Sequence, residues 1–356
     1  MPMTIKDIAA RLGVSTATVS RALNDKPGVS DEVRRRVLDL AADLSFAPNG
    51  TGRGLSTART QTLGFVVRRK AFPTVQDHFY LQIMHGVEEE VARNGYHVIL
   101  SAVGAPAGAN TMNGANDLSL VREGRVDGLI LAGPDIDSSL ILELQHNGVP
   151  LVLVDNALRQ TPIDCVLNDD REGAFAAVSH LIEHGYERIA FIGGPSTWIS
   201  TVERRAGFED ALAAHNKTAC AIVHQRETTV ETGYAAMIEL LEQDTRPNAV
   251  FAVNDSMAFG AMRAARENGL TVPGDLALAG FDDIDAAQHT TPPLTTVRIF
   301  KERVGEVAAR RLLDRLTGPA TPPQRTYVGT ELIIRQSCGC PPAPIRREVV
   351  SAADTP

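Results

Sequence analysis

The sequence predicts an α/β protein built from a small three-helix head and a larger, doubly wound core with parallel sheets. Three short amphipathic segments occupy the first 46 residues, and the turn between the first two is tight. From residue 62 onward, short apolar runs alternate with longer segments of helical period. This alternation is typical of a parallel sheet covered by helices.

The two parts also differ in charge. Residues 1–60 carry nine Lys or Arg against six Asp or Glu, a net charge of +3, which leaves −11 for the other 296 residues of a chain whose total is −8. With 356 residues and 44% hydrophobic side chains, the chain can fill two or three cores. An acidic body with a small basic head restricts phosphate contact to the head, as expected of a regulated DNA-binding protein.

Several classes of protein are disfavoured by what the sequence lacks. It has no run of about 18 apolar residues and no export signal, so we expect a soluble, cytoplasmic protein without a membrane partner. No nucleophile elbow, HExxH, Walker loop or dinucleotide-binding fingerprint occurs, and we expect neither an enzyme nor a cofactor. The cysteines are too sparse for a disulfide scaffold and lack the paired spacing of a zinc site. This predicts no metal site and four free thiols: Cys165, Cys220, Cys338 and Cys340.

The head is expected to contain three helices. Thr4 caps the first, with Asp7 placed to reach back to it, and a glycine ends this helix. Ser15 caps a second helix over 16–23 after a turn of about three residues. A third helix begins after Ser30 and carries three arginines on its outer face.

The second helix has the features of the reading helix of a helix-turn-helix. Thr16 is short enough to let the helix approach bases, Ala17 offers a contact for a thymine methyl, and Arg21 matches guanine O6 and N7. Thr18 and Ser20 are placed to bind phosphate. The alternative is a helical packing module with solvated arginines, which needs neither so tight a turn nor so bare a helix face.

The core is expected to contain two α/β series that end in shared closing elements. The expected strands are 63–67, 98–102, 128–132, 151–154, 189–192, 221–224, 249–253, 276–281, 296–299 and 331–335, with helices over 80–94 and 301–316. The Pro- and Ala-rich tail at 341–356 lacks periodicity, and we expect it to be disordered.

Candidate ligand-binding residues follow the apolar runs, because open α/β sheets bind ligands beyond the carboxyl ends of their strands. Asp155, Asn254 and Asp282 each occupy such a position. These side chains suit a hydroxyl-rich ligand, since carboxylates accept hydrogen bonds from OH groups and an amide donates them. A single residue of this kind is also a common turn or helix cap, and roughly one in three would be structural.

Aromatic side chains add to this candidate pocket. Trp198, the only tryptophan, is placed to stack on the C–H face of a sugar. Phe79 and Tyr80, with His78 beside them, are placed to line the opposite wall. For Trp198, Phe79 and Tyr80, packing in the core or in a dimer interface explains the residue equally well.

The head resembles that of the LacI/GalR family of transcriptional regulators. The matching runs are Thr-Ile-Lys-Asp-Ile-Ala at 4–9 and Gly-Val-Ser-Thr-Ala-Thr-Val-Ser-Arg-Ala-Leu-Asn at 13–24. Pro48-Asn49, Leu55 and the run from Arg59 to Gly64 resemble the hinge of that family. The candidate DNA contacts that follow from the helix and the resemblance are Thr4, Ser15, Thr16, Ala17, Thr18, Ser20, Arg21, Asn24, Asn49, Arg53 and Leu55.

The resemblance also implies a core with two lobes around a cleft, as in periplasmic binding proteins. Arg204 lies three residues before a glycine, like the effector-binding arginine of the family, and Asn254 and Asp282 match its ligand-binding positions. The implied organisation is a head at 1–46, a hinge at 47–60, a core at 61–340 with an N-lobe of about 61–158 and 289–322 and a C-lobe of about 159–288 and 323–340, and a tail at 341–356.

The hinge departs from the family pattern. In the family, the two hinge helices of a dimer lie in the minor groove and each inserts a leucine, the role implied for Leu55. Gly50, Gly52 and Gly54 stand where helix formers are common, and together they disfavour a hinge helix by roughly 3 kcal/mol. We therefore expect residues 50–57 to be disordered away from DNA and to fold when two hinges meet in the groove.

These features predict a ligand-responsive repressor that binds a near-palindromic operator as a homodimer, with a sugar or sugar phosphate as effector. A purine or another small metabolite is the alternative effector, because it also fits a pocket of Arg, Asp and Asn. A solute-binding protein of a transporter is a further alternative, which the DNA-binding head in place of an export signal argues against. No leucine heptad is visible near the C-terminus, which favours a dimer over a tetramer.

Overall fold

The computed structural model describes residues 4–23, 26–44, 59–68, 78–104 and 118–341. The chain forms two compact units, one that runs to Thr62 and includes 124–127, and one that holds the rest of the chain. Asn24, Asn49, Arg53, Leu55 and nearly all of the tail lie outside the described residues, as do the predictions made for them.

The head consists of the three helices expected from the sequence, namely α1 (Ile5–Leu12), α2 (Thr16–Leu23) and α3 (Asp31–Asp43). The predicted capping box is present, because the amide of Thr4 donates to Asp7 (2.8 Å) and the amide of Asp7 donates to the Thr4 hydroxyl (3.4 Å). The Ser15 hydroxyl accepts from the amide of Thr18 (3.0 Å) and so caps α2. Each helix contributes two buried side chains to a small core: Ile8, Ala9, Val19, Ala22, Val37 and Ala41.

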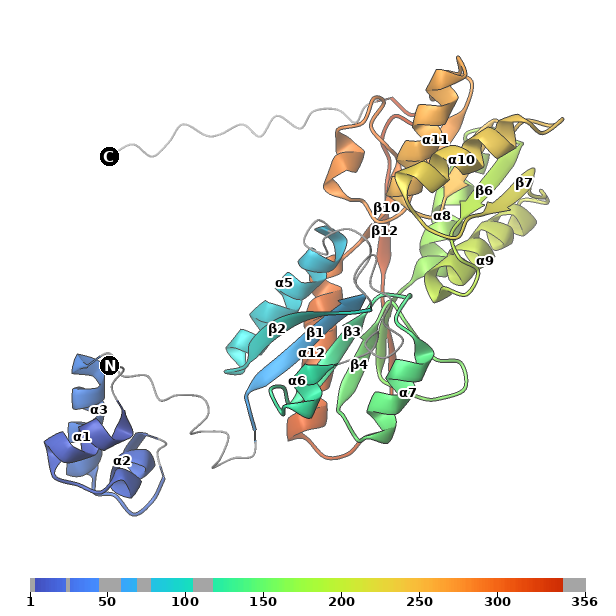
Figure 1. Cartoon of the computed structure of the whole chain (residues 1–356). Coiled ribbons are helices and arrows are strands. Elements are labelled where there is room, and N and C mark those ends of the chain that lie inside the picture. Colours follow the sequence, from blue (N-terminus) through green and yellow to red (C-terminus); the bar gives the residue numbers. More distant parts are fainter. Residues whose placement is uncertain (1–3, 24–25, 45–58, 69–77, 105–117, 342–356) are drawn as a thin grey trace, which may run out of the picture. The chain divides into compact units, whose positions relative to one another are not determined.

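The core unit has two sheets at opposite ends and an antiparallel strand pair between them (Figure 1). The first sheet has the order β11-β5-β4-β3-β1-β2 and the second has the order β7-β6-β8-β9. The strands of the first sheet are β1 (Thr62–Arg68), β2 (His97–Val103), β3 (Gly128–Ala132), β4 (Leu151–Val154), β5 (Cys165–Asn168) and β11 (Arg325–Val328). Those of the second are β6 (Ile189–Gly193), β7 (Ala221–His224), β8 (Ala249–Ala252) and β9 (Ala277–Ala279), and the antiparallel pair is β10 (Thr296–Ile299) and β12 (Thr330–Ile333).

Helices cover both sheets. They are α5 (His78–Arg93), α6 (Ser119–Arg122), α7 (Ser138–His146), α8 (Asp170–Glu183), α9 (Ile199–Ala214), α10 (Val230–Leu241), α11 (Asp255–Glu267) and α12 (Lys301–Thr317), with a 3₁₀ turn η2 (Asp285–Gln288). Helices α5 and α12 pack against each other at two glycines. A Cβ added to Gly86 would overlap the carbonyl of Glu302, and one added to Gly305 would overlap the carbonyl of Ile83. The two helix backbones therefore approach more closely than they could if either glycine were replaced by a residue with a side chain.

Two strands of the first sheet were not expected from the sequence. β5 pairs in parallel with β4 and with β11, whereas the implied lobe ranges assign residues 165–168 and 325–328 to the C-lobe. β5 has only four residues and β11 is a partly exposed edge strand, so neither contains a recognisable apolar run. The chain therefore passes between the lobes after Asn168 and after Val328, later than the ranges imply.

Two further observations concern the cysteines and the length of the helices. The structure records Cys165, Cys220, Cys338 and Cys340 as free thiols, as predicted. No helix within the described ranges has both the length and the apolar character needed to cross a bilayer.

Candidate functional site

A buried cluster of one arginine and three aspartates lies where strands of the two sheets end. Asp155 directly follows β4, Asp282 lies just beyond β9, Asp170 begins α8 after β5, and Arg204 lies on α9. Asp155 and Asp282 have φ angles of 54° and 106°, which L-residues rarely adopt. Strained residues of this kind cluster at binding sites, so the backbone itself marks this place.

Arg204 organises the cluster. Its Nε donates to Oδ1 of Asp170 (2.8 Å), and its Nη1 donates to the carbonyl of Val253 (2.6 Å) and lies 3.1 Å from Oδ1 of Asp282. The guanidinium carbon stands 3.8 Å from the centroid of the Phe281 ring. Since Arg204 is only 5% exposed, its donors are fixed before any ligand arrives.

The cluster is short of positive charge. Burial raises the pKa of Asp155 to about 8; the charges of Asp170 and Asp282 raise it as well, and Arg204 opposes them. Burial also raises the pKa of Asp170 to about 6, against the attraction of Arg204. One guanidinium serves three carboxyl groups, so the cluster retains protons near neutral pH. A ligand that donates hydrogen bonds to these carboxylates would favour their ionised forms.

Two buried acceptors in this region lack a hydrogen-bond partner within the described parts of the chain. They are Oδ1 of Asp155 and Oδ1 of Asn168. Asp155 directly follows β4, and Asn168 is the last residue of the neighbouring strand β5. Both residues are more than nine-tenths buried. An unsatisfied buried acceptor costs about 1–3 kcal/mol, so two such atoms at adjacent strand ends indicate a missing donor, such as a ligand hydroxyl or amine.

The aromatic candidates divide between the cluster and its surroundings. Tyr80 joins the cluster, since its hydroxyl lies 3.4 Å from Oδ2 of Asp155. Phe79 packs edge-on against Tyr80, with ring centroids 5.1 Å apart, and lies 5.6 Å from Nζ of Lys301. Trp198 is partly buried and precedes α9, while His78 begins α5 and its side chain lies outside the described residues.

Asn254 has the structural role that the sequence analysis gave as the alternative to ligand binding, because it is a helix cap. It caps α11, where its Oδ1 accepts from the amide of Met257 (2.9 Å) and its Nδ2 donates to the carbonyl of Thr228 (3.3 Å). Both ends of the amide are engaged by the protein, so an effector contact by Asn254 stays a prediction.

Asp170 and Asn168 were missed from the sequence. Both belong to the Cys-Val-Leu-Asn-Asp-Asp run at 165–170, where β5 ends and α8 begins. The rule that polar residues at strand ends bind ligands would have selected them, had the four-residue strand been recognised.

Asp283 belongs to a different group although it follows Asp282 in the chain. Its carboxylate accepts from Arg298 (2.8 Å) and Arg335 (2.6 Å), and these bonds outweigh its burial and lower the pKa of Asp283. These three residues line an open pocket of about 430 Å³ that also includes Lys301 and contains no member of the Arg204 cluster. The two adjacent aspartates therefore do not form an acid–base pair.

The exposed face of α2 carries the three predicted base contacts. Thr16, Ala17 and Arg21 are all exposed. Arg34 on α3 has a different role, because it donates to the carbonyls of Ala22 (3.3 Å) and Lys26 (2.8 Å) and so ties α3 to the end of α2. The head thus has an exposed α2 face, for which base reading stays a prediction, and an arginine on α3 that holds its helices together.

Comparison with known proteins gives the same division of the chain. Residues 4–49 match the model for bacterial regulatory proteins of the lacI family, and residues 178–338 match that for a periplasmic binding protein-like domain. The HTH-type transcriptional repressor PurR of Mannheimia succiniciproducens is 33% identical over 340 residues, which cover 94% of this chain and 98% of the relative. The probable HTH-type transcriptional repressor ExuR of Bacillus subtilis is 32% identical over 340 residues with the same coverage.

Solved structures resemble the whole chain as well. A lac repressor dimer bound to operator and the anti-inducer ONPF superposes with a TM-score of 0.81 at 27% identity, covering 95% of this chain and 99% of that one. A complex of the transcriptional regulator CelR with cellobiose gives 0.72 at 32% identity, covering 94% and 99%. The reading helix, the two α/β lobes and the relatives that match them from end to end show that this chain belongs to the LacI family of transcriptional regulators, as a DNA-binding repressor with an effector-binding domain and not an enzyme.

Proposed function

We propose that the effector of this repressor is a sugar that binds at the Arg204 cluster and controls operator binding by a homodimer. The observation that carries the proposal is the orphaned Oδ1 of Asp155 beside a buried, preorganised Arg204. A sugar hydroxyl can donate to a carboxylate and accept from a guanidinium at the same time. Adjacent hydroxyls of one ring would therefore satisfy the acceptors and use the donors of this site.

The charge of the cluster favours an unphosphorylated sugar over a sugar phosphate. Asp155, Asp170 and Asp282 surround a single guanidinium, whose Nε contacts Asp170 and whose Nη1 contacts Asp282 and a backbone carbonyl, so that Nη2 is the nitrogen left to donate to a neutral hydroxyl. A phosphate dianion placed here would meet like charges without a free cation to pair with. The cellobiose bound to the related CelR supports the same class of ligand. A purine or another small metabolite is the second candidate, since ring N–H groups also donate to carboxylates.

The proposed operator complex rests on the head and the hinge. The exposed Thr16, Ala17 and Arg21 would read base edges in the major groove, and Thr4, Ser15, Thr18, Ser20 and Asn24 would hold the helix on the backbone. Asn49, Arg53 and Leu55 would act in the minor groove. A single head contacts few bases, so two heads related by symmetry are needed for useful specificity. The related lac repressor binds its operator as a dimer.

Because the chain belongs to a family of bacterial DNA-binding regulators, its location is the cytoplasm.

A screen of the full chain tests the class of effector. Thermal-shift measurements would compare neutral mono- and disaccharides, sugar phosphates, nucleobases and amino acids. Each hit would then be added to an operator selected from random duplex DNA by binding to the protein. We expect a neutral sugar to raise the melting temperature and to change operator affinity. A hit confined to nucleobases would support the second candidate instead, and a sugar that stabilises the core but leaves operator affinity unchanged would contradict control by that sugar.

A further inference from the structure

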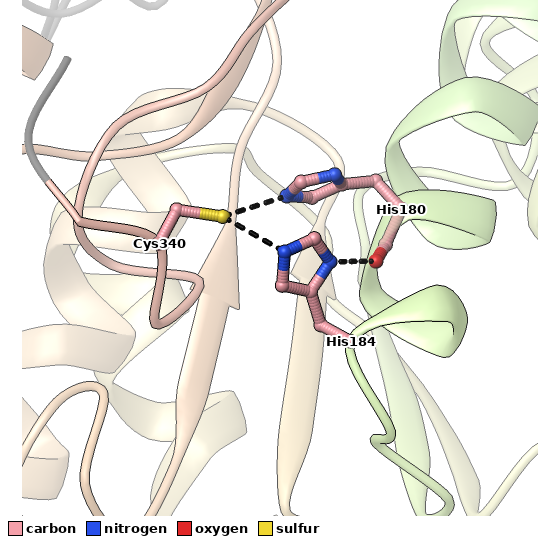
Figure 2. A group of neighbouring side chains, drawn as sticks. All are labelled: His180, His184 and Cys340. Atoms are coloured by element: carbon pink, nitrogen blue, oxygen red, sulfur yellow. Dashed lines mark hydrogen bonds between the residues drawn. The ribbon is translucent and has the colours of Figure 1, made fainter.

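Two histidines and two cysteines that are far apart in the sequence meet at one edge of α8. His180 lies in the last turn of α8 and His184 is its C-terminal cap, one helical turn further on. Cys338 and Cys340 belong to the segment that follows β12. The Sγ of Cys340 lies 3.0 Å from Nε2 of His184 and 3.5 Å from Nε2 of His180 (Figure 2). The Sγ of Cys338 lies 3.3 Å from the same His180 nitrogen.

The spacing of these atoms fits a small cation. One possible ligand atom from each of His180, His184 and Cys340 lies within 4.8 Å of the other two. Zinc binds nitrogen at about 2.0–2.1 Å and sulfur at about 2.3 Å in a tetrahedron, which places neighbouring N and S ligands about 3.5 Å apart. Of the two observed N···S separations, 3.5 Å matches this value and 3.0 Å falls about half an ångström short of it. In the described part of the chain, this is the one group of three or more such side chains that converges.

The orientation of His184 gives independent support. Its Nδ1 lies 2.9 Å from the carbonyl oxygen of His180, as Figure 2 shows. A carbonyl can only accept, so Nδ1 is the donor in this contact, and Nε2, the atom that faces Cys340, is the ring nitrogen left to bind a metal. A backbone acceptor on the remote nitrogen is the usual support of a metal-binding histidine, because it fixes both the tautomer and the ring plane.

The burial of the group leaves a route for an ion. His180 is 7% exposed and Cys338 is fully buried, whereas His184 and Cys340 reach the surface. A cation can therefore enter from the side of Cys340 and His184. Cys338, beside His180 on the buried side, is the nearest thiol for a fourth position.

We propose that His180, His184 and Cys340 form a zinc-binding site that fastens the C-terminal segment to α8. This segment already pairs with β9, since the amide of Leu278 donates to the carbonyl of Ser337 (2.9 Å), and the Tyr186 hydroxyl donates to the carbonyl of Cys338 (3.2 Å). A bound ion would close a loop of more than 150 residues between His184 and Cys340 and so hold the segment against local opening. His180 and His184 are four residues apart, and Cys338 and Cys340 are two apart. Neither pair is a zinc site alone, and the fold brings the two pairs together.

The test uses the full chain, stripped of metal under reducing conditions and titrated with Zn²⁺ in competition with a chromophoric chelator. We expect one tightly bound ion per chain. Cys340→Ser and His184→Gln should each weaken binding by more than about tenfold, since even the loss of a supporting group around a zinc ligand costs about 10–100-fold. Substitution with Co²⁺ should give a thiolate-to-metal charge-transfer band that Cys340→Ser diminishes. Zinc should raise the melting temperature of the wild type more than that of either variant.

Two matched controls separate this site from casual binding by surface groups. His215 caps α9 with the same bond to the carbonyl four residues earlier, 2.8 Å from Nδ1 to Ala211, and Cys220 is a partly exposed thiol on the same lobe. His215→Gln and Cys220→Ser should bind zinc as the wild type does. The proposal is overturned if the wild type binds no zinc tightly, if Co²⁺ gives no thiolate band, or if Cys340→Ser, shown by circular dichroism to be folded, binds zinc with unchanged affinity.

Discussion

Asp155 is the residue on which the behaviour of the core near neutral pH depends most. It is buried, its Oδ1 lacks a partner in the described structure, and its pKa is raised to about 8 by burial and by the charge of Asp170. A carboxyl group with a pKa of about 3.9 in the unfolded chain and about 8 in the folded one binds a proton more tightly when folded. Its contribution to stability is therefore fully present below about pH 4 and is lost as the pH rises through about 8.

Asp155→Asn should remove this dependence, because an amide of the same shape does not ionise and asparagine tolerates the left-handed backbone. We expect the variant to be more stable than the wild type at pH 9 by more than about 1 kcal/mol, and this difference to shrink steadily as the pH falls toward about 4. Urea denaturation across this range measures the difference. The exposed Asp285→Asn, as control, should follow the wild type. Parallel pH profiles for the wild type and Asp155→Asn would contradict the assignment.

Single residues also show how much of the site the sequence could predict. Asp155, Arg204 and Asp282 were expected from strand ends and from the family pattern, and the fold brings them together. Asn254 was chosen by the same rule, yet its side chain is occupied as a helix cap. The rule identifies a position in the chain but not the direction of the side chain, which depends on tertiary packing.

Among the elements, α2 and α3 carry arginines with different tasks. Arg21 on α2 is exposed on the reading face, while Arg34 on α3 bonds two carbonyls at the end of α2. Arg21→Ala should weaken operator binding and relax its base preference, at a cost of about 1–3 kcal/mol, without changing the stability of the head.

Arg34→Ala should do the reverse, destabilising the head by about 1–2 kcal/mol because two backbone acceptors lose a charged donor. Fluorescence anisotropy with operator variants and thermal denaturation of the same proteins separate the two effects. Unchanged base preference in Arg21→Ala would show that α2 is not the reader.

The crossing of α5 and α12 depends on glycine. Gly305→Ala would push a methyl group into the carbonyl of Ile83, whereas the space around Gly329, between β11 and β12, is open. We expect Gly305→Ala to destabilise the core by about 1–3 kcal/mol and Gly329→Ala to change its stability by less than about 0.5 kcal/mol. Equal unfolding midpoints in urea for the two variants would show that the helices can move apart without loss.

The elements were predictable where their pattern was strong. The three head helices, the caps of α1 and α3 and the strands with a clear apolar run follow from periodicity and capping residues. β5 ends in a polar asparagine and β11 is a partly exposed edge strand, so neither shows a clear apolar run. Both are recognised by their pairing in register, which no local pattern records. The same limit hid the meeting of His180 and His184 with Cys340.

For the whole molecule, the proposed effector site at Arg204 would be linked to the head by a shift between two populations. An effector alters operator affinity only if it binds the DNA-competent and DNA-incompetent forms differently, and couplings of this kind are about 5- to 150-fold. Asp155 follows a strand of the first sheet, and Asp282 and Arg204 belong to the second lobe. A ligand that bridges them would therefore favour one relative placement of the lobes.

The hinge is where this shift would reach DNA. Residues 47–58 lie outside the described ranges, and the prediction rests on Gly50, Gly52 and Gly54. Gly52→Ala and Gly54→Ala should favour the hinge helix by about 1 kcal/mol each, tightening operator binding and blunting the effector response. Operator titrations with and without effector measure both changes, and protection of the hinge amides from exchange in the DNA-free wild type would argue against a hinge that folds on DNA.

The most direct test of the account is operator affinity as a function of effector concentration in the wild type and in Arg204→Ala and Asp282→Ala. Arg171→Ala, which removes an exposed arginine of the same lobe paired with Asp210, serves as the control. We predict that the effector changes the operator affinity of the wild type and the control by about 5-fold or more. In Arg204→Ala and Asp282→Ala it should change this affinity by less than about twofold, while both variants still bind operator. A normal effector response in Arg204→Ala and Asp282→Ala would show that the effector binds elsewhere.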